Sequence, residues 1–515
     1  MGRAGPFNAG RRPMSERGED ATLVWWRQKP VWIMLFLGFS AGVPLLLIFS
    51  SLSLWLREAG VSKSDVTYFS WAALGFSFKF VWAPLVDKLP LPLLSRALGR
   101  RRGWLLFAQL AVAASIALMA SVDPQQQLAW MAIAAVLLGF SAATQDVVID
   151  AFRIESANPR LQALLSSTYI AGYRIGMIAA GAGALYLAEG FGSTNDVYSY
   201  IAWRNTYYCM AGLMLVGVAT TLLIAEPPAG DVSPYHYDTG DYLRFFIAFV
   251  ITVATFVGVL FGMPDAPVWF SGYSQQLFSF SYSSLVLLLA VFIGYQAFRL
   301  QSAMGVVNQQ LVDESYVQPI ADFIQRYKKL ALWVLLLVGF YRVSDIVLGV
   351  IANVFYQDMG YSKDEIASVT KVFGVVMTIV GSFLGGFLTL RFGVIRVLML
   401  GAVLVSATNL LFMWLAGLEV SVLALTVVIA ADNLSGGVAV AAFVAWLSSL
   451  TNVSFTATQY AIFSSVMTLF PKLLGGYTGS VVETVGYEIF FLLASLLGVP
   501  VIALIWFLRK RLEAA

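Results

Sequence analysis

The stretch LAWMAIAAVLLGFSAATQDVVIDAFR (residues 128–153) joins a long apolar run to two carboxylates near its end. A helix needs roughly 20 predominantly apolar residues to cross a bilayer, and this run is long enough. Asp146 and Asp150 are four residues apart, so on a helix they share one face. Carboxylates inside a bilayer are costly unless they face protein, water or a counter-charge. The stretch therefore predicts a working part of a membrane protein.

The composition of the whole chain agrees with that prediction. The 515 residues are 59% hydrophobic and 12% charged, whereas a soluble domain carries roughly 25% charged residues. Apolar runs of about 20 residues recur along the chain, which predicts an all-α polytopic membrane protein with about fourteen spans. Their expected limits are 31–56, 64–86, 104–122, 128–149, 162–187, 205–225, 245–262, 279–298, 330–356, 364–388, 394–416, 420–447, 455–476 and 482–508.

Lysine and arginine are distributed unevenly around these spans. They gather before the first and ninth spans, after the second, fourth and tenth, and at the end of the chain. By the positive-inside rule, this side is cytoplasmic, and both termini are expected there. The polar, basic start of the chain has no cleavage site, so no signal peptide is expected. A single cysteine, Cys209, excludes an internal disulfide.

The spans form two sets of six with an insertion between them. We expect N-terminal and C-terminal six-helix bundles at 29–225 and 330–508, flanked by a disordered cytoplasmic tail at 1–28 and a basic cytoplasmic tail at 509–515. The insertion, 226–329, contains two extra transmembrane helices. It ends in an amphipathic segment that is expected on the cytoplasmic surface as a structural linker or, alternatively, as a regulatory element.

Two connections between spans repeat one pattern. The second–third connection reads APLVDKLPLPLLSRALGRRRG (83–103), and the tenth–eleventh reads GGFLTLRFGVIR (385–396). Both approximate Gly-x-x-x-Asp-Arg/Lys-x-Gly-x-Arg, the cytoplasmic signature of the major facilitator superfamily, although the second has Leu390 in place of the acid. Two copies, six spans apart when the insertion is excluded, resemble the duplicated major facilitator fold of two six-helix halves.

Cationic side chains within the spans are candidates for binding a substrate. They are Lys79, Arg174, Arg342 and Lys371. Arg174 and Arg342 are expected near the bilayer midplane, where transporters built from repeats bind their substrates. Arginine holds carboxylates and phosphates bidentately, so the substrate is predicted to be an anion. In the alternative interpretation, Arg342 simply pairs with Asp345.

Acidic side chains on the same helices supply candidates for proton coupling and for a gate. Asp146 and Asp345 are predicted to take up the coupling proton. Asp150 lies nearer the cytoplasmic end of its span, and it is predicted to close a cytoplasmic gate by pairing with basic residues of the 83–103 connection. The gate set is Asp87, Arg100, Arg101, Arg102 and Asp150. A structural role for both acids of the 128–153 stretch remains an alternative.

Polar and aromatic side chains on these helices suit the recognition of sugars and amides. They are Gln145, Asn433, Gln459 and Tyr460, and core packing is the alternative for each. The chain has no P-loop sequence and no HExxH, CxxC or GxSxG motif. We therefore expect neither an ATP-driven pump nor an enzyme, and no cofactor or metal.

Eight stretches together resemble the AmpG family of muropeptide permeases in the major facilitator superfamily. They are GFSAGVPLLL (38–47), FKFVWAPLVD (78–87), GRRRGW (99–104), ATQDVVIDA (143–151), GYRIGM (172–177), DNLSGG (432–437), AAFVAWLSSLTN (441–452) and FTATQYAIFSS (455–465). The resemblance implies a proton-motive-force-driven importer in the bacterial inner membrane. It implies that N-acetylglucosaminyl-1,6-anhydro-N-acetylmuramyl peptides enter the cytoplasm by alternating access for peptidoglycan recycling, and that they influence β-lactamase induction.

We expect a monomer in the lipid bilayer that binds the muropeptide and protons but no nucleic acid. Two alternatives remain open. One is a carrier of acetyl-CoA or another large anion, and the other is a muropeptide receptor that does not transport. The duplicated signatures and the two midplane arginines favour transport.

Overall fold

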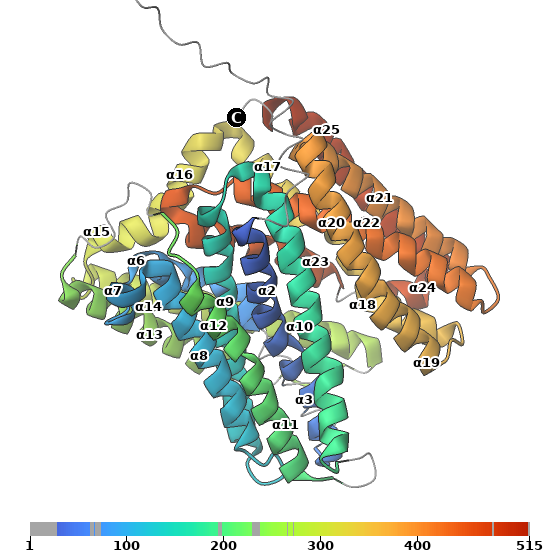
Figure 1. Cartoon of the computed structure of the whole chain (residues 1–515), viewed down its shortest axis with the longest axis horizontal. Helices are drawn as coiled ribbons and strands as arrows, with labels where there is room; N and C mark the ends of the chain where they lie inside the picture. Colours follow the sequence, from blue (N-terminus) through green and yellow to red (C-terminus); the bar gives the residue numbers. More distant parts are fainter. Residues whose placement is uncertain are drawn as a thin grey trace, which may run out of the picture.

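The computed structural model describes residues 28–61, 66, 69, 74–193, 198–228, 237–264, 266–270, 272–475 and 478–512. The predicted disordered tail lies outside the described residues except for Gln28, and so do the last three residues of the predicted basic tail. The described chain is a bundle of long helices (Figure 1). Within it, twelve helical segments are long and apolar enough to cross a membrane. An all-α polytopic membrane protein is therefore confirmed.

The helices fall into two sets and a connecting insertion. The first set, here called the N-half, comprises α2 (Lys29–Ile48), α3 (Ser50–Glu58), α5 (Leu74–Phe78), η3 (Lys79–Val81), α6 (Ala83–Lys88), α7 (Leu94–Leu98), α8 (Arg100–Ala120), α9 (Leu128–Ser156), η4 (Pro159–Leu161), α10 (Gln162–Gly190), α11 (Tyr200–Leu213) and α12 (Leu215–Leu223). The insertion comprises α13 (Thr239–Gly262), α14 (Gly272–Ala303), α15 (Gln309–Val312), η5 (Asp313–Val317), α16 (Gln318–Tyr327) and η6 (Lys328–Leu330).

The second set, here called the C-half, follows the insertion. It comprises α17 (Ala331–Phe340), α18 (Val343–Asp358), α19 (Lys363–Ile366), η7 (Ala367–Phe373), α20 (Gly374–Phe392), α21 (Val394–Ala416), α22 (Val422–Ser449), η8 (Val453–Phe455), α23 (Thr456–Gly475), α24 (Thr478–Leu496) and α25 (Gly498–Leu512). Most of the predicted spans correspond to one of these long helices or to two collinear ones.

Two predicted spans, 64–86 and 455–476, are not among the twelve long apolar helices of the described chain. The described part of the first is broken into α5, η3 and α6, with a 3-10 turn at Lys79–Val81. The second is α23, which has 20 residues, several hydroxyl side chains and an internal proline, Pro471. Both segments carry polar residues that the sequence singled out, and both lie where the two halves meet.

Glycines let the central helices of each half approach closely. In the N-half, a Cβ at Gly38 of α2 would lie 2.2 Å from the Tyr169 carbonyl oxygen of α10, and one at Gly172 would lie 1.9 Å from the Leu35 oxygen. In the C-half, a Cβ at Gly437 of α22 would lie 2.4 Å from the Thr378 oxygen of α20. Small residues at such contacts are the usual way in which membrane helices pack tightly. Each half is therefore held together by a backbone-to-backbone seam.

The two halves contact each other near one end of the bundle. The elements that meet there are α10 with α20 and α22, and α23 with η3, α6 and α9. Residues that follow one another in α2 contact residues that follow one another in α10 in the same order, so these helices run in the same direction. The start of α2 therefore lies at the same end of the bundle as the start of α10. In Figure 1 the ribbons of the two halves converge toward this end and spread apart toward the other.

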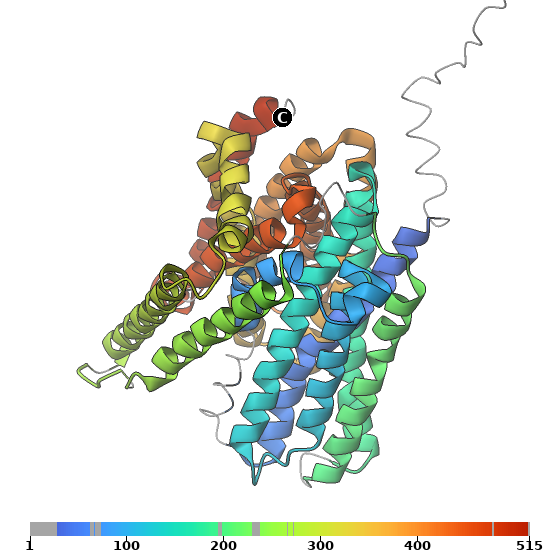
Figure 2. The same cartoon turned by 90° about the vertical axis from the view of Figure 1, so that its left-hand side faces the viewer.

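The inserted helices α13 and α14 pack on each other and lean away from both halves (Figure 2). The segment after them, 309–327, is here called the strap. Its Glu314 carboxylate lies 3.5 Å from Lys88 Nζ of the N-half. Its Asp322 accepts hydrogen bonds from Asn452 and Gln459 of the C-half at 3.0 and 2.8 Å. The strap therefore bridges the two halves on the side where they meet.

Gly437→Ala should destabilise the protein, because its Cβ has no room beside the α20 backbone. Overpacking of this kind typically costs about 1–3 kcal/mol. The measurement is the thermal unfolding midpoint of the detergent-solubilised protein.

Gly436→Ala is the matched control, because a Cβ at the neighbouring Gly436 would meet nothing within 4 Å. We expect its midpoint to equal or exceed that of the unsubstituted protein. Equal midpoints for the two variants would contradict a tight seam between α20 and α22.

Gln459→Ala should also destabilise the protein, because the Gln459 amide bonds the strap to α23. Its Nε2 donates to the Pro319 oxygen at 2.8 Å and its Oε1 accepts from Arg326 at 3.0 Å. Leaving buried polar groups without partners costs about 1–3 kcal/mol, so the unfolding midpoint should fall.

Gln125→Ala serves as the control, because Gln125 Nε2 makes a single bond, to the Ala59 oxygen, at the edge of the bundle. A change of about 0.5 kcal/mol or less is expected there. An unchanged midpoint for Gln459→Ala together with weaker substrate binding would instead support the substrate contact predicted from the sequence.

Candidate functional site

Four charged side chains form a cluster around one face of α9. Lys79 Nζ lies 2.5 Å from Asp146 Oδ2 and 3.8 Å from Asp150 Oδ2. The shared face predicted for the two carboxylates is thus confirmed, because one ammonium group reaches both. Arg153, on the next turn of α9, donates from Nη2 to Asp150 Oδ1 at 3.2 Å. Lys79, Asp146, Asp150 and Arg153 are here called the charge cluster.

The break around η3 sets the position of Lys79. It is the first residue of this 3-10 turn, and only 5% of its surface is exposed. A buried ammonium inside a helix bundle needs a counter-charge, and Asp146 supplies the nearer one. The Tyr169 hydroxyl of α10 donates a second hydrogen bond to Asp146, at 2.8 Å. The ammonium that the sequence predicted to bind substrate is thus bonded to a carboxylate in this state.

The sequence predicted that Asp150 pairs with the arginines at the start of α8, but the acid of α9 that pairs with them is Glu155. Glu155 Oε1 lies 2.5 Å from Arg101 Nη2 and 3.5 Å from Arg100 Nη2. Arg102 instead donates to backbone carbonyl oxygens at the end of α12. Along the bundle axis, the start of α8 lies beside the last turns of α9, which contain Glu155. Asp150 lies earlier in α9, beside η3.

Asp87 links the two halves through the start of α23. Its carboxylate accepts from Arg101 Nη2 at 2.8 Å within the N-half. It also accepts from the Thr458 backbone N–H at 2.8 Å, the Thr458 hydroxyl at 2.7 Å and the Ala457 N–H at 3.2 Å. The first N–H groups of a helix lack partners within it and favour a negative charge. Of the predicted gate residues, Asp87 therefore bonds across the contact between the halves, and Arg101 holds Asp87 from within the N-half.

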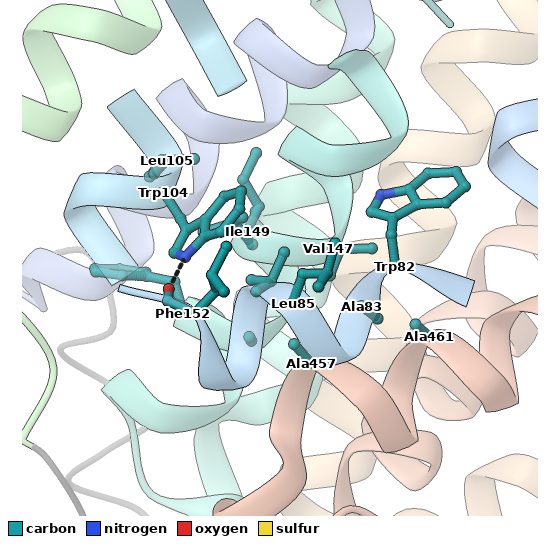
Figure 3. Close-up of a cluster of buried hydrophobic side chains, with 14 of the residues drawn as sticks. Trp82, Ala83, Leu85, Trp104, Leu105, Val147, Ile149, Phe152, Ala457 and Ala461 are labelled. Carbon is teal, nitrogen blue, oxygen red and sulfur yellow. Dashed lines mark hydrogen bonds between the residues drawn. The ribbon is translucent and has the colours of Figure 1, made fainter. Parts of the chain in front are cut away.

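An apolar seam lies beside these polar contacts (Figure 3). Leu85 and Ala83 of α6 lie between α9, which contributes Val147, and α23, which contributes Ala457 and Ala461. The small alanine side chains let α23 approach α6. Trp104 at the start of α8 borders the seam and donates its indole N–H to the Leu89 oxygen at 2.9 Å. Apolar packing and charged hydrogen bonds thus close the same end of the bundle.

Three of the four polar residues predicted to recognise a substrate are packed into the protein. Gln145 is fully buried and donates to the Ser40 hydroxyl of α2 at 3.1 Å. Gln459 binds the strap, as described above. The buried Tyr460 ring lies 5.3 Å from the Arg153 guanidinium. The fourth, Asn433, is partly exposed and accepts from Thr378 at 2.8 Å.

Arg174 and Arg342 come from opposite halves and lie within electrostatic range of each other. Arg342 pairs with Asp345, which is the alternative that the sequence left open, and about a third of each side chain is exposed, 27% and 31%. Arg174 interacts electrostatically with both residues. Within the described chain Arg174 has no ion pair of its own. Arg342 has Asp345 as its counter-charge, and Asp432 of α22 also lies within electrostatic range of Asp345. Arg174 is therefore the guanidinium between the halves that could take an anion as its partner.

Irregular helix geometry accompanies several of the predicted cations. Arg342 is the residue between α17 and α18, with φ −100° and ψ 8°. Lys371 lies in the π-helical turn η7, is exposed and donates to Asn353 at 3.1 Å. Such irregular turns are frequent at functional sites.

Sequence reasoning missed Arg153, Glu155 and Tyr169. Arg153 follows Asp150 by three residues, so helical spacing could have identified it as a partner. Tyr169 lies on a different helix, and no local spacing connects it with Asp146. The site as a whole offers ion pairs, hydrogen bonds and titratable carboxylates, which suits binding and proton exchange.

Comparison with known proteins supports this description. A family model described as Major Facilitator Superfamily matches residues 88–307 and 334–515, and one described as Acetyl-coenzyme A transporter 1 matches residues 30–129. A protein of Rickettsia conorii named Putative transporter AmpG 4 is 30% identical over 93% of this chain and 96% of its own. The Anhydromuropeptide permease of Escherichia coli is 28% identical over 93% of this chain and 80% of its own.

A solved structure of the proton:xylose symporter XylE has the same fold. Its TM-score is 0.57 at 12% identity, and the match covers 93% of this chain and 94% of that one. At this identity the likeness concerns the fold alone. The family match over most of the chain and the relative at 30% identity show that the protein belongs to the AmpG family of the major facilitator superfamily of membrane transporters.

Proposed function

We propose that this protein imports N-acetylglucosaminyl-1,6-anhydro-N-acetylmuramyl peptides from periplasm to cytoplasm for peptidoglycan recycling. Transport is driven by the proton motive force and proceeds by alternating access between two six-helix halves, 29–225 and 330–508. The imported products influence β-lactamase induction. The protein acts as a monomer in the bacterial inner membrane, with both termini in the cytoplasm.

The observation that carries the proposal is an arginine between the halves that has no ion pair in the described chain. Arg174 interacts electrostatically with Arg342 and Asp345 of the other half and has no ion pair of its own in the described chain. A muropeptide has peptide carboxylates that guanidinium groups bind bidentately. The relative named Anhydromuropeptide permease, alignable over 93% of this chain, supports the same substrate class.

The charges are assigned to three tasks in this proposal. Arg174, Arg342 and Lys371 attract and hold the anionic substrate. Asp146 and Asp345 exchange protons, which compensate for moving an anion into a negative interior. Asp87 and Arg101 hold the cytoplasmic end closed through α23. The clustering of basic residues at this end supports a cytoplasmic assignment, and the contacts between the halves then correspond to a state closed toward the cytoplasm.

A transporter of acetyl-CoA is the second candidate, because a family model of that description matches residues 30–129. A receptor that does not transport is the third. Uptake of labelled anhydro-muropeptide into vesicles, with and without an uncoupler, separates the three. The proposal requires saturable, uncoupler-sensitive uptake of the muropeptide. Uptake of acetyl-CoA alone selects the second candidate, and binding without uptake selects the third.

Arg174→Ala should weaken uptake of the full muropeptide more than uptake of the bare disaccharide, because the disaccharide lacks the peptide carboxylates. Losing a hydrogen bond to a charged group costs about 1.5–3 kcal/mol, so KM for the muropeptide should rise roughly tenfold or more. Arg244→Ala, on an exposed arginine of the inserted helix α13, is the control and should leave KM unchanged. An equal loss for both substrates would argue against a contact with the peptide.

Asp146→Asn should reduce uptake driven by a proton gradient about tenfold while sparing exchange of substrate across the membrane, because exchange requires no net proton movement. The measurement compares gradient-driven uptake with exchange at equal pH on both sides. Asp313→Asn in the exposed part of the strap is the control. Parallel loss of both activities would remove Asp146 from the coupling mechanism.

A further inference from the structure

Arg153 lies in the middle of the contact between the halves, and its side chain is 0% exposed. Within the N-half, Nη1 donates to Gln162 at 3.1 Å and to Ser166 at 3.2 Å. The same nitrogen donates to the Ser448 hydroxyl of the C-half at 2.9 Å. The guanidinium also lies 5.3 Å from the centre of the Tyr460 ring of the C-half. One buried cation thus contacts both halves.

The charge of Arg153 is balanced differently from that of Arg101. Arg153 has one ion-pair partner in the described chain, Asp150. Arg101, a second fully buried arginine nearby in the N-half, has two, Asp87 and Glu155. Neutralising one carboxylate would therefore leave Arg101 with a counter-charge but would leave Arg153 without one.

The groups that face Asp150 come from four elements. They are Asp146 and Arg153 on α9, Lys79 on η3, Tyr169 on α10 and Tyr460 on α23. Two cations balance two carboxylates when both acids are ionised and the tyrosines are neutral. One added proton leaves the charge cluster with one excess positive charge. Lys79 then pairs with the one carboxylate that is still ionised.

We propose that Arg153 is a positioning residue that links protonation of the charge cluster to opening of the cytoplasmic end. The inference rests on the proton coupling proposed above. Asp146, which exchanges protons in the function proposed above, passes a proton from the periplasmic side to an oxygen of Asp150. Arg153 then lacks its counter-charge, and an unpaired buried charge is strongly destabilising. Its guanidinium leaves the contact, the bonds to Ser448 and the Tyr460 ring are lost, and the halves separate there.

The test measures how fast a cysteine in the apolar seam reacts from the cytoplasmic side. The background is Cys209→Ser, because Cys209 is the one cysteine of the chain and is exposed. The reporter is Ala461→Cys, on a buried alanine of α23 in the seam (Figure 3). Inverted vesicles containing the full chain, without substrate or proton gradient, receive a membrane-impermeant maleimide across a series of pH values. Each rate is normalised to that of the unfolded protein at the same pH.

In the reporter protein the normalised rate should rise as the pH falls. Asp150→Asn mimics the protonated acid and should raise the rate about tenfold or more at neutral pH, because it leaves Arg153 unpaired. Glu155→Gln is the matched control and should stay within about threefold of the parent, since Arg101 keeps a second carboxylate. Arg153→Gln should abolish the pH dependence, and adding Asp150→Asn to it should change nothing further.

Two results would overturn the role of Arg153. One is an Asp150→Asn effect of the same size with and without Arg153. The other is a rate that does not depend on pH in the reporter protein. If Arg153→Gln does not fold, Arg153→Lys replaces it. This variant keeps the charge and should keep a pH response, whereas loss of that response would contradict the proposal.

The assay distinguishes this inference from the proposed function, because it contains neither substrate nor gradient. Uncoupler-sensitive muropeptide uptake combined with pH-independent labelling would retain the proposed function and reject the role of Arg153. Failure of muropeptide uptake combined with pH-dependent labelling would reject the proposed function and retain the role of Arg153.

Discussion

A charge buried in a membrane helix bundle needs a partner, and this requirement accounts for how α9 is connected to its neighbours. Asp146 and Asp150 share Lys79 of η3, and Glu155 holds Arg101 of α8. Because these partners belong to different elements, satisfying the charges joins α9 to the broken second segment and to the next helix. From Arg101 the connection continues to Asp87, which accepts a hydrogen bond from the backbone of α23, so it reaches from one half into the other.

The contacts within each half differ in kind from several of the contacts between the halves. Within a half, glycines bring backbones together, as at Gly172 against α2 and Gly437 against α20. Such seams resist change, since close packing leaves no alternative arrangement of similar energy. Between the halves, Asp87 and Arg153 bond to the ends of α23 and α22. Hydrogen bonds of this type can be exchanged for water when the halves separate, so rigid halves and a separable contact coexist.

Sequence reasoning succeeded where the relevant information is local. The periodicity of α9 was sufficient to put Asp146 and Asp150 on one face, and the three-residue spacing anticipated the pairing of Arg342 with Asp345. It failed where the helix is irregular or where the partner is remote. The 64–86 span was predicted as one helix, but the break at η3 turns Lys79 toward α9. The assignment of Gln459 to a substrate stays a prediction, but its bonds to the strap were not foreseen, because the strap precedes it by more than a hundred residues.

By itself, the sequence determined that the chain is a membrane protein with duplicated six-helix sets, where its basic residues concentrate and which polar side chains its apolar spans contain. These properties follow from composition, run length and local spacing, which depend only on neighbouring residues. Only the tertiary structure decided which partner each charge takes. Lys79 and Asp146 are 67 positions apart, and Asp87 and Thr458 are 371 apart. A helical period defines the face on which a side chain lies, but the level and rotation of the helix opposite depend on how the whole bundle packs.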